Sequence, residues 1–123
     1  MYGQKNVEQI KDNCGSLIAI RINDFTILEN SEFITAADGF LQVGAFKYDH
    51  PHKVKKHKHN EIVRTVNRTQ ELIFILSGAM KANLFDDDDN FLNTLLLKPG
   101  SGLLIVKGWH DFEIVENCNF FEV

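Results

Sequence analysis

The chain has 123 residues, of which 44% are hydrophobic and 24% are charged. This length fits one domain, and the formal net charge of -4 argues against a nucleic-acid-binding protein, whose phosphate contacts need a basic surface. The first residues lack the apolar core of a signal peptide, and no stretch reaches the roughly 18 apolar residues that cross a bilayer. We therefore expect a cytoplasmic, single-domain protein over residues 1–123, without a nucleic acid or membrane partner.

The N-terminal part of the chain predicts short strands after a polar arm. Residues 1–13 are polar and weakly helical, so we expect residues 1–16 to form the arm. The apolar runs 17–22 and 25–28 flank Asn23 and Asp24 and are typical of a hairpin. A brief edge strand at 33–35 and a strand over 40–48 are expected to follow.

Two histidines stand two residues apart in the sequence Lys-Lys-His-Lys-His. Residues two apart in an extended strand share a face, so His57 and His59 would point together into the interior while Lys56 and Lys58 point away. This alternation predicts a strand that carries two metal ligands. The competing interpretation is a solvated basic loop, because four of the five histidines lie among lysines within residues 50–59.

A carboxylate can reach the same interior from a neighbouring strand. Residues 70–78 predict a strand with Glu71, Ile73 and Ile75 on one face, ending at a Ser-Gly turn. Glu61 is the rival, since it continues the alternation of His57 and His59. At about 3.4 Å per residue, its Cα would lie roughly 14 Å from that of His57, so Glu71 is the better candidate.

The C-terminal half indicates a succession of strands separated by polar turns. Strands are expected at 80–85, 91–97, 103–106, 109–115 and 120–123, with an aspartate-rich hairpin tip at 86–90. His110 shares a face with Phe112 and Ile114, whereas Trp109 points the other way. Many short strands with almost no helical period predict an all-β barrel or sandwich.

These motifs resemble those of the cupins, small β-barrels of jelly-roll type. His57-Lys58-His59 matches the histidine pair of the first cupin motif, and Glu71, with six residues before Gly78, matches its second half. Gly100, Gly108 and His110 stand where the second motif has its glycines and histidine. The resemblance covers roughly residues 40–123 and implies a single-domain cupin-type jelly-roll β-barrel, whose metal ligands are His57, His59, Glu71 and His110.

The sequence departs from the family pattern at several positions. Eleven residues separate His59 from Glu71, where the family has a much shorter gap. Val106 replaces a proline, only Trp109 separates Gly108 from His110, and Ile114 replaces an asparagine. The chain therefore resembles a divergent subgroup, similar to cupins of bacterial surface-polysaccharide gene clusters.

The resemblance implies a function at the proposed centre. Three imidazoles and one carboxylate suit Fe, Mn, Ni, Co, Cu or Zn as a divalent ion. We expect a small polar, carbohydrate-related ligand, with Glu71 and His57 as catalytic residues if the protein is a metal-dependent oxygenase or isomerase. The alternatives are a non-catalytic sugar-binding or regulatory module, and a metal-free sugar-nucleotide isomerase or epimerase with His57 or His59 as general base. The family also implies a homodimer, for which the strand at 17–22 would be a natural edge.

Overall fold

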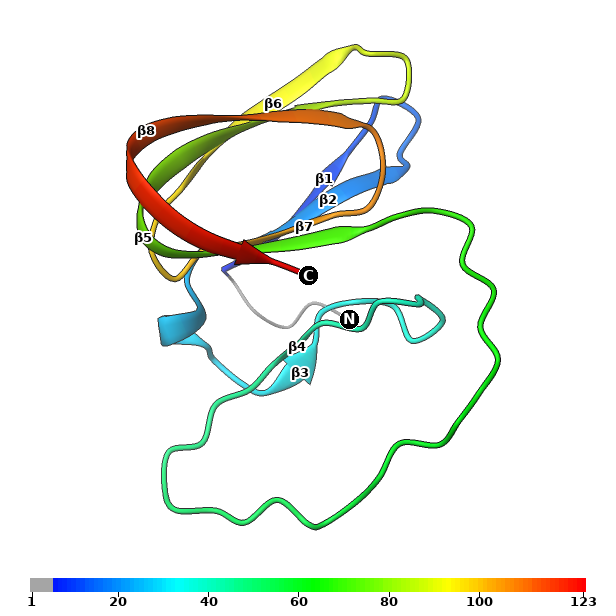
Figure 1. Ribbon diagram of the computed structural model, residues 1–123, viewed down its shortest axis with the longest axis vertical. Coiled ribbons are helices and arrows are strands. Elements are labelled where there is room, and N and C mark those ends of the chain that lie inside the picture. Colours follow the sequence, from blue (N-terminus) through cyan, green and yellow to red (C-terminus); the bar gives the residue numbers. More distant parts are fainter. Residues whose placement is uncertain (1–5) are drawn as a thin grey trace.

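The computed structural model of the chain describes residues 6–123, so the first five residues of the expected arm lie outside the described part. The described residues form antiparallel strands and one short 3-10 turn (Figure 1). In chain order these are β1 (Val7–Lys11), β2 (Leu17–Ile22), η1 (Phe25–Ile27), β3 (Glu32–Phe33), β4 (Gly44–Ala45), β5 (Glu71–Phe85), β6 (Phe91–Leu97), β7 (Gly102–Ile105) and β8 (Trp109–Glu122). The prediction of an all-β fold is therefore confirmed.

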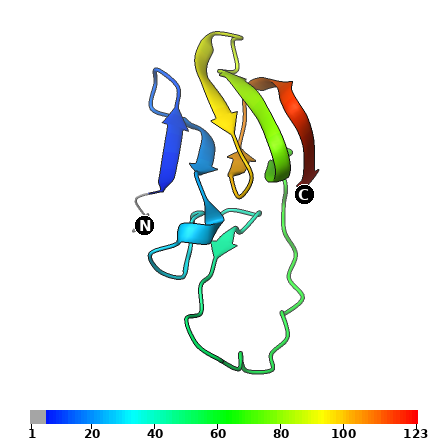
Figure 2. The ribbon, with the colours of Figure 1, turned by 90° about the vertical axis from the view of Figure 1, so that its left-hand side faces the viewer.

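The larger sheet is organised around the long strand β5. Its strand order is β1-β2-β7-β5-β6, and β8 also pairs with β5. The first residues of β5 pair with β7, its last residues pair with β6, and β8 follows it along nearly its whole length. Figures 1 and 2 show β5 and β8 curving together. Over residues 6–123 these pairings form an open path rather than a closed ring.

Apolar side chains cover both faces of the sheet where β2, β7 and β5 meet. The strand β7 is buried throughout, as is typical of a strand that packs on both faces. We call the two sides the inner face and the outer face. The inner face packs the first cluster, which includes Ala19, Ile73, Ile75, Met80, Ala82, Leu84, Leu95, Leu97, Leu103 and Ile105. The outer face packs a second cluster under residues 28–45, which includes Ile20, Ile22, Leu28, Ile34, Val43, Ala45 and Leu104.

The N-terminal region differs from the sequence-based expectation in two places. Within the expected arm, residues 7–11 form β1, which pairs with β2 and buries Ile10. The expected hairpin of 17–22 with 25–28 is wrong, because β2 pairs with β1 and β7 instead. Asp24 explains the second difference: its Oδ1 accepts a hydrogen bond from the Thr26 backbone N–H at 2.8 Å and so caps the 3-10 turn η1. Because β2 is an internal strand, it is not the free edge that was expected to support a homodimer.

The Ser-Gly sequence at the middle of β5 bends the strand instead of ending it. Gly78 has a positive φ of 77°, and the register between β5 and β8 shifts on both sides of it. The expected break between strands at 109–115 and 120–123 is also wrong, because β8 is continuous from Trp109 to Glu122. Both strands therefore stay paired through a bulge, which allows the ribbon to curve.

The expected strand around His57 and His59 is wrong. The structure has no strand between β4 and β5, and all of residues 46–69 are exposed. In Figures 1 and 2 this segment, which we call the long loop (residues 46–70), runs away from the sheet and returns to it. The physical reason is the composition: alternating lysine and histidine has the period of a strand but offers no apolar face for the sheet to bury. The interpretation as an exposed basic loop agrees with this arrangement.

The described part of the chain contains no helix long and apolar enough to cross a membrane.

Candidate functional site

The structure brings together two of the four predicted metal ligands, Glu71 and His110. Glu71 Oε2 lies 3.3 Å from His110 Nε2. Glu71 begins β5, where it pairs with Ile105 at the end of β7. The turn after β7, in which Gly108 has a positive φ of 86°, leads directly to His110 at the start of β8. The contact therefore depends on the β7–β8 turn and on the pairing of β5 with β7.

Both side chains lie at the margin of the inner core. The side chains of Glu71 and His110 are 36% and 26% exposed. His110 pairs with the buried Leu84 across β5 and β8, and its ring lies 5.2 Å from that of Phe112, measured between centroids. Phe112 was expected to share a face with His110, and the contact between their rings agrees with that expectation. The pair is thus partly shielded from water while one side stays open.

The second ring nitrogen of His110 has no hydrogen-bond partner within residues 6–123. Nδ1 is buried and makes no hydrogen bond to any described residue. Either tautomer leaves this atom unsatisfied, because neither a donor nor an acceptor reaches it. An unsatisfied buried polar atom costs about 1–3 kcal/mol. Because most buried polar atoms in native proteins have a partner, such an atom is consistent with strain, a catalytic role or a bound water or ion.

His57 and His59 lie together in the long loop, apart from Glu71 and His110. Their ring centroids are 5.5 Å apart, and Nδ1 of His57 lies 2.8 Å from the carbonyl oxygen of Lys55. Across residues 6–123, no group of three or more His, Cys, Asp or Glu side chains is close enough to hold a metal ion. The four predicted ligands therefore form two pairs, one on the sheet and one in the loop.

The rival carboxylate Glu61 belongs to the loop. Together with His59, Asn60, Ile62 and Arg64 it lines an open hollow in the long loop. Glu71 contacts His110 instead, so the two carboxylates lie with different histidines. This grouping makes Glu71 the carboxylate of the sheet and Glu61 a carboxylate of the loop.

A transition metal fits the Glu71–His110 pair in part. Imidazole nitrogen and carboxylate oxygen are the donor types that the divalent ions Fe, Mn, Ni, Co, Cu and Zn accept. The pair offers one of each within 3.3 Å, but a protein-held ion usually needs three or more ligands. The residues as arranged therefore supply half of the predicted coordination shell.

The neighbouring hairpin tip is structural. Asp86 Oδ1 accepts hydrogen bonds from the backbone N–H groups of Asn90 and Asp88, at 2.8 and 3.0 Å. The hydrogen bonds from Asn90 lower the pKa of Asp86 from its ordinary value. Trp109 is 62% exposed and donates from Nε1 to the Asp87 carbonyl at 3.2 Å, so its expected outward orientation is confirmed.

Gln9 and Gln70, which were not predicted as site residues, line a cavity on the outer face of the sheet. Gln70 directly precedes Glu71, and neighbouring residues of an extended segment point to opposite faces. The sequence signal for this cavity was therefore Gln70, a polar residue on the opposite face of the strand from the candidate ligand Glu71.

Comparisons of this chain with protein-family models, with curated proteins and with solved structures found no match.

Proposed function

We propose that the chain is a small cupin-type metal-binding protein whose centre is completed when the long loop closes on the sheet. In this proposal His57 and His59 join Glu71 and His110 around one divalent transition metal. The observation that carries it is the 3.3 Å approach of Glu71 Oε2 to His110 Nε2, two donors from distant parts of the sequence. The unpartnered Nδ1 of His110 gives further support.

The length and freedom of the loop support its closure. Eleven residues separate His59 from Glu71, and an extended segment of that length reaches at most about 40 Å. Residues 49–69 make no backbone hydrogen bonds to one another or to the sheet in the described structure. Moving the loop therefore breaks no strand pairing.

A free strand edge lies beside His110. Within residues 6–123, β8 pairs only with β5, so its other edge still has unpaired backbone groups. We propose that residues around His57 and His59 add to this edge in the closed state. Such an addition would turn the open path of strands toward the jelly-roll barrel that the cupin resemblance implies.

The proposed ligand is a small polar, carbohydrate-related molecule. A bound transition metal would supply a Lewis acid with open positions for it. The Glu71 carboxylate can accept a proton from such a ligand, and His57 can donate or accept one after closure. The exposed lysines of the loop would favour an anionic ligand. The same proposal includes an oxygenase or isomerase activity. It also includes a homodimer that forms through a free strand edge such as that of β1.

A second candidate is a metal-free isomerase. Glu71 and His110 are a carboxylate and an imidazole already within 3.3 Å, which is a possible acid–base pair without any metal. If the protein binds a sugar at this pair but does not convert it, the protein is a sugar-binding module instead of an enzyme.

Calorimetric titration with Zn²⁺ tests the metal proposal. Wild type should bind one ion per chain, and His57→Ala and His110→Ala should each weaken binding at least tenfold. His50→Ala is the matched control, because it removes a loop histidine outside the proposed centre and should bind as wild type does. Equal binding by wild type, His57→Ala and His110→Ala would favour the metal-free candidate.

A further inference from the structure

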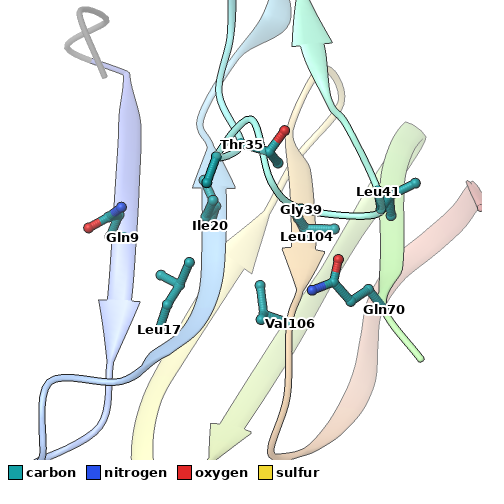
Figure 3. A pocket seen from close by; sticks show the side chains of 10 residues that line it. Gln9, Leu17, Ile20, Thr35, Gly39, Leu41, Gln70, Leu104 and Val106 are labelled. Atoms are coloured by element: carbon teal, nitrogen blue, oxygen red, sulfur yellow. The ribbon is translucent and has the colours of Figure 1, made fainter. Parts of the chain in front are cut away.

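A cavity of about 260 Å³ lies on the outer face of the sheet, on the opposite side from the Glu71–His110 pair. Residues from β1, β2 and β7 form its floor, and residues 35–41 cross over it (Figure 3). Gln70 reaches this cavity, whereas Glu71, the next residue, contacts His110 on the inner face. The cavity is therefore separate from the proposed metal centre.

The lining of the cavity is mostly apolar and carries no charge. Ile20 and Leu104, both 1% exposed, belong to the outer-face core and form the bottom. Leu17, Leu41 and Val106 complete the apolar wall. No charged side chain is among the described residues that line it. An ionised ligand would thus lose its hydration without gaining a counter-charge.

Two carboxamides supply the polar groups that a ligand could use. Gln9 and Gln70 line opposite sides of the cavity, and neither side chain has a hydrogen bond to another described residue (Figure 3). Thr35 is already engaged, since its hydroxyl accepts from the Val43 N–H at 3.0 Å and donates to Gln42 Oε1 at 3.3 Å. Each free carboxamide offers both donors and an acceptor.

The cover of the cavity is held in place before any ligand binds. Nε2 of Gln42 donates to the carbonyl oxygens of Ala36 and Gly39, at 2.8 and 2.6 Å. The backbone N–H of Gly39 also donates to the Ala36 carbonyl at 3.0 Å. A ligand therefore enters a preformed cavity and has little chain to order.

We infer that this cavity binds a small neutral molecule of one or two rings that carries an amide-like edge. Its volume exceeds the about 150 Å³ of an apolar cavity that accepts benzene and falls below the about 300 Å³ at which pockets for drug-sized ligands begin. The apolar wall contacts the ring, and the amide edge pairs with the carboxamide of Gln70, while Gln9 lies on the opposite side of the cavity.

Benzamide and benzoate are the probes that test this inference, because they have similar shapes and differ in charge. Each is titrated into the ¹⁵N-labelled full chain and followed by NMR. Benzamide should shift the side-chain NH₂ signals of Gln9 and Gln70, and benzoate should bind at least tenfold more weakly. Val106→Phe, which fills the cavity, should abolish binding. Gln70→Leu should weaken benzamide binding several-fold. It should leave the binding of toluene unchanged, because toluene has a similar ring but no amide group.

Three results would overturn the inference: equal affinity for benzamide and benzoate, shifts confined to residues outside the cavity, or wild-type binding by both variants. His110→Ala separates this inference from the proposed metal centre, because that variant should bind benzamide as wild type does even if it binds no metal.

Discussion

Gly78 of β5 faces the backbone carbonyl of Asn117 on β8 so closely that a Cβ atom at Gly78 would overlap it. The two residues lie where the register of the β5–β8 pair shifts, and Gly78 has a φ of 77°. A residue without a side chain is therefore required at the bend of the ribbon that carries Glu71 and His110.

Gly78→Ala should lower the free energy of unfolding more than an ordinary glycine substitution at positive φ. Gly15→Ala is the matched control, because Gly15 has a φ of 83° and open space around it. The positive φ costs about 1–2 kcal/mol in both variants, and the overlap with Asn117 adds about 1–3 kcal/mol in Gly78→Ala alone. Urea denaturation measures both losses, and equal losses would contradict this account of the bend.

Two leucines of β5 test the assignment of the inner core. Leu84 is 0% exposed and pairs with His110, whereas Leu76 on the same strand is 56% exposed. Leu84→Ala should reduce the free energy of unfolding by about 2–5 kcal/mol, and Leu76→Ala by about 0.5 kcal/mol. Chemical denaturation gives both values. A similar loss in the two variants would mean that the inner face is assigned to the wrong side.

The Asp86 turn should make a pH-dependent contribution to stability. The pKa of Asp86 is lowered in the folded chain, chiefly by the Asn90 backbone N–H, so folding favours the ionised carboxylate. That contribution is present above the ordinary pKa of 3.8 and is lost as the pH falls through the lower folded pKa. The difference in urea midpoint between wild type and Asp86→Ala should therefore be constant from neutral pH to about pH 5 and shrink below about pH 4.

Asp88→Ala is the control for that experiment, because it removes a carboxylate of the same turn that has no hydrogen bond among the described residues. A difference for Asp86→Ala that stays constant down to the lowest pH would contradict the proposed role of the Asn90 hydrogen bonds.

Metal binding should order the long loop. Amide hydrogen exchange of residues 49–69 should be fast without metal, because none of their backbone N–H groups donates a hydrogen bond in the described structure. Saturating Zn²⁺ should slow exchange around His57 and His59 in wild type and leave it fast in His110→Ala. Protection that also develops in His110→Ala would show that the loop binds the ion without the sheet.

The strands of the C-terminal half were predictable because their apolar residues alternate or are continuous. The run that became β7 and the alternation that began β8 each had an apolar face for the core to bury. The segment of His57 and His59 shares the same period but lacks that face, so periodicity alone predicted a strand wrongly. Gly78 shows a second limit, since the same residue serves a turn or a bulge, and only the pairing with β8 decides between them.

For the site, the sequence motifs predicted that Glu71 and His110 meet, and the structure brings them into contact. The role of the loop histidines stays a prediction. Gln9 and Gln70 were not predicted because an isolated glutamine carries no pattern, and their shared cavity depends on how residues 35–41 cross the sheet.

A metal centre at the Glu71–His110 pair can be checked by elemental analysis of the purified wild type, Glu71→Gln and Glu61→Gln proteins. We expect about one transition-metal ion per chain in wild type and in Glu61→Gln, and a loss of most of that metal in Glu71→Gln. Full metal content in Glu71→Gln, or a loss confined to Glu61→Gln, would contradict a centre built on the Glu71–His110 pair.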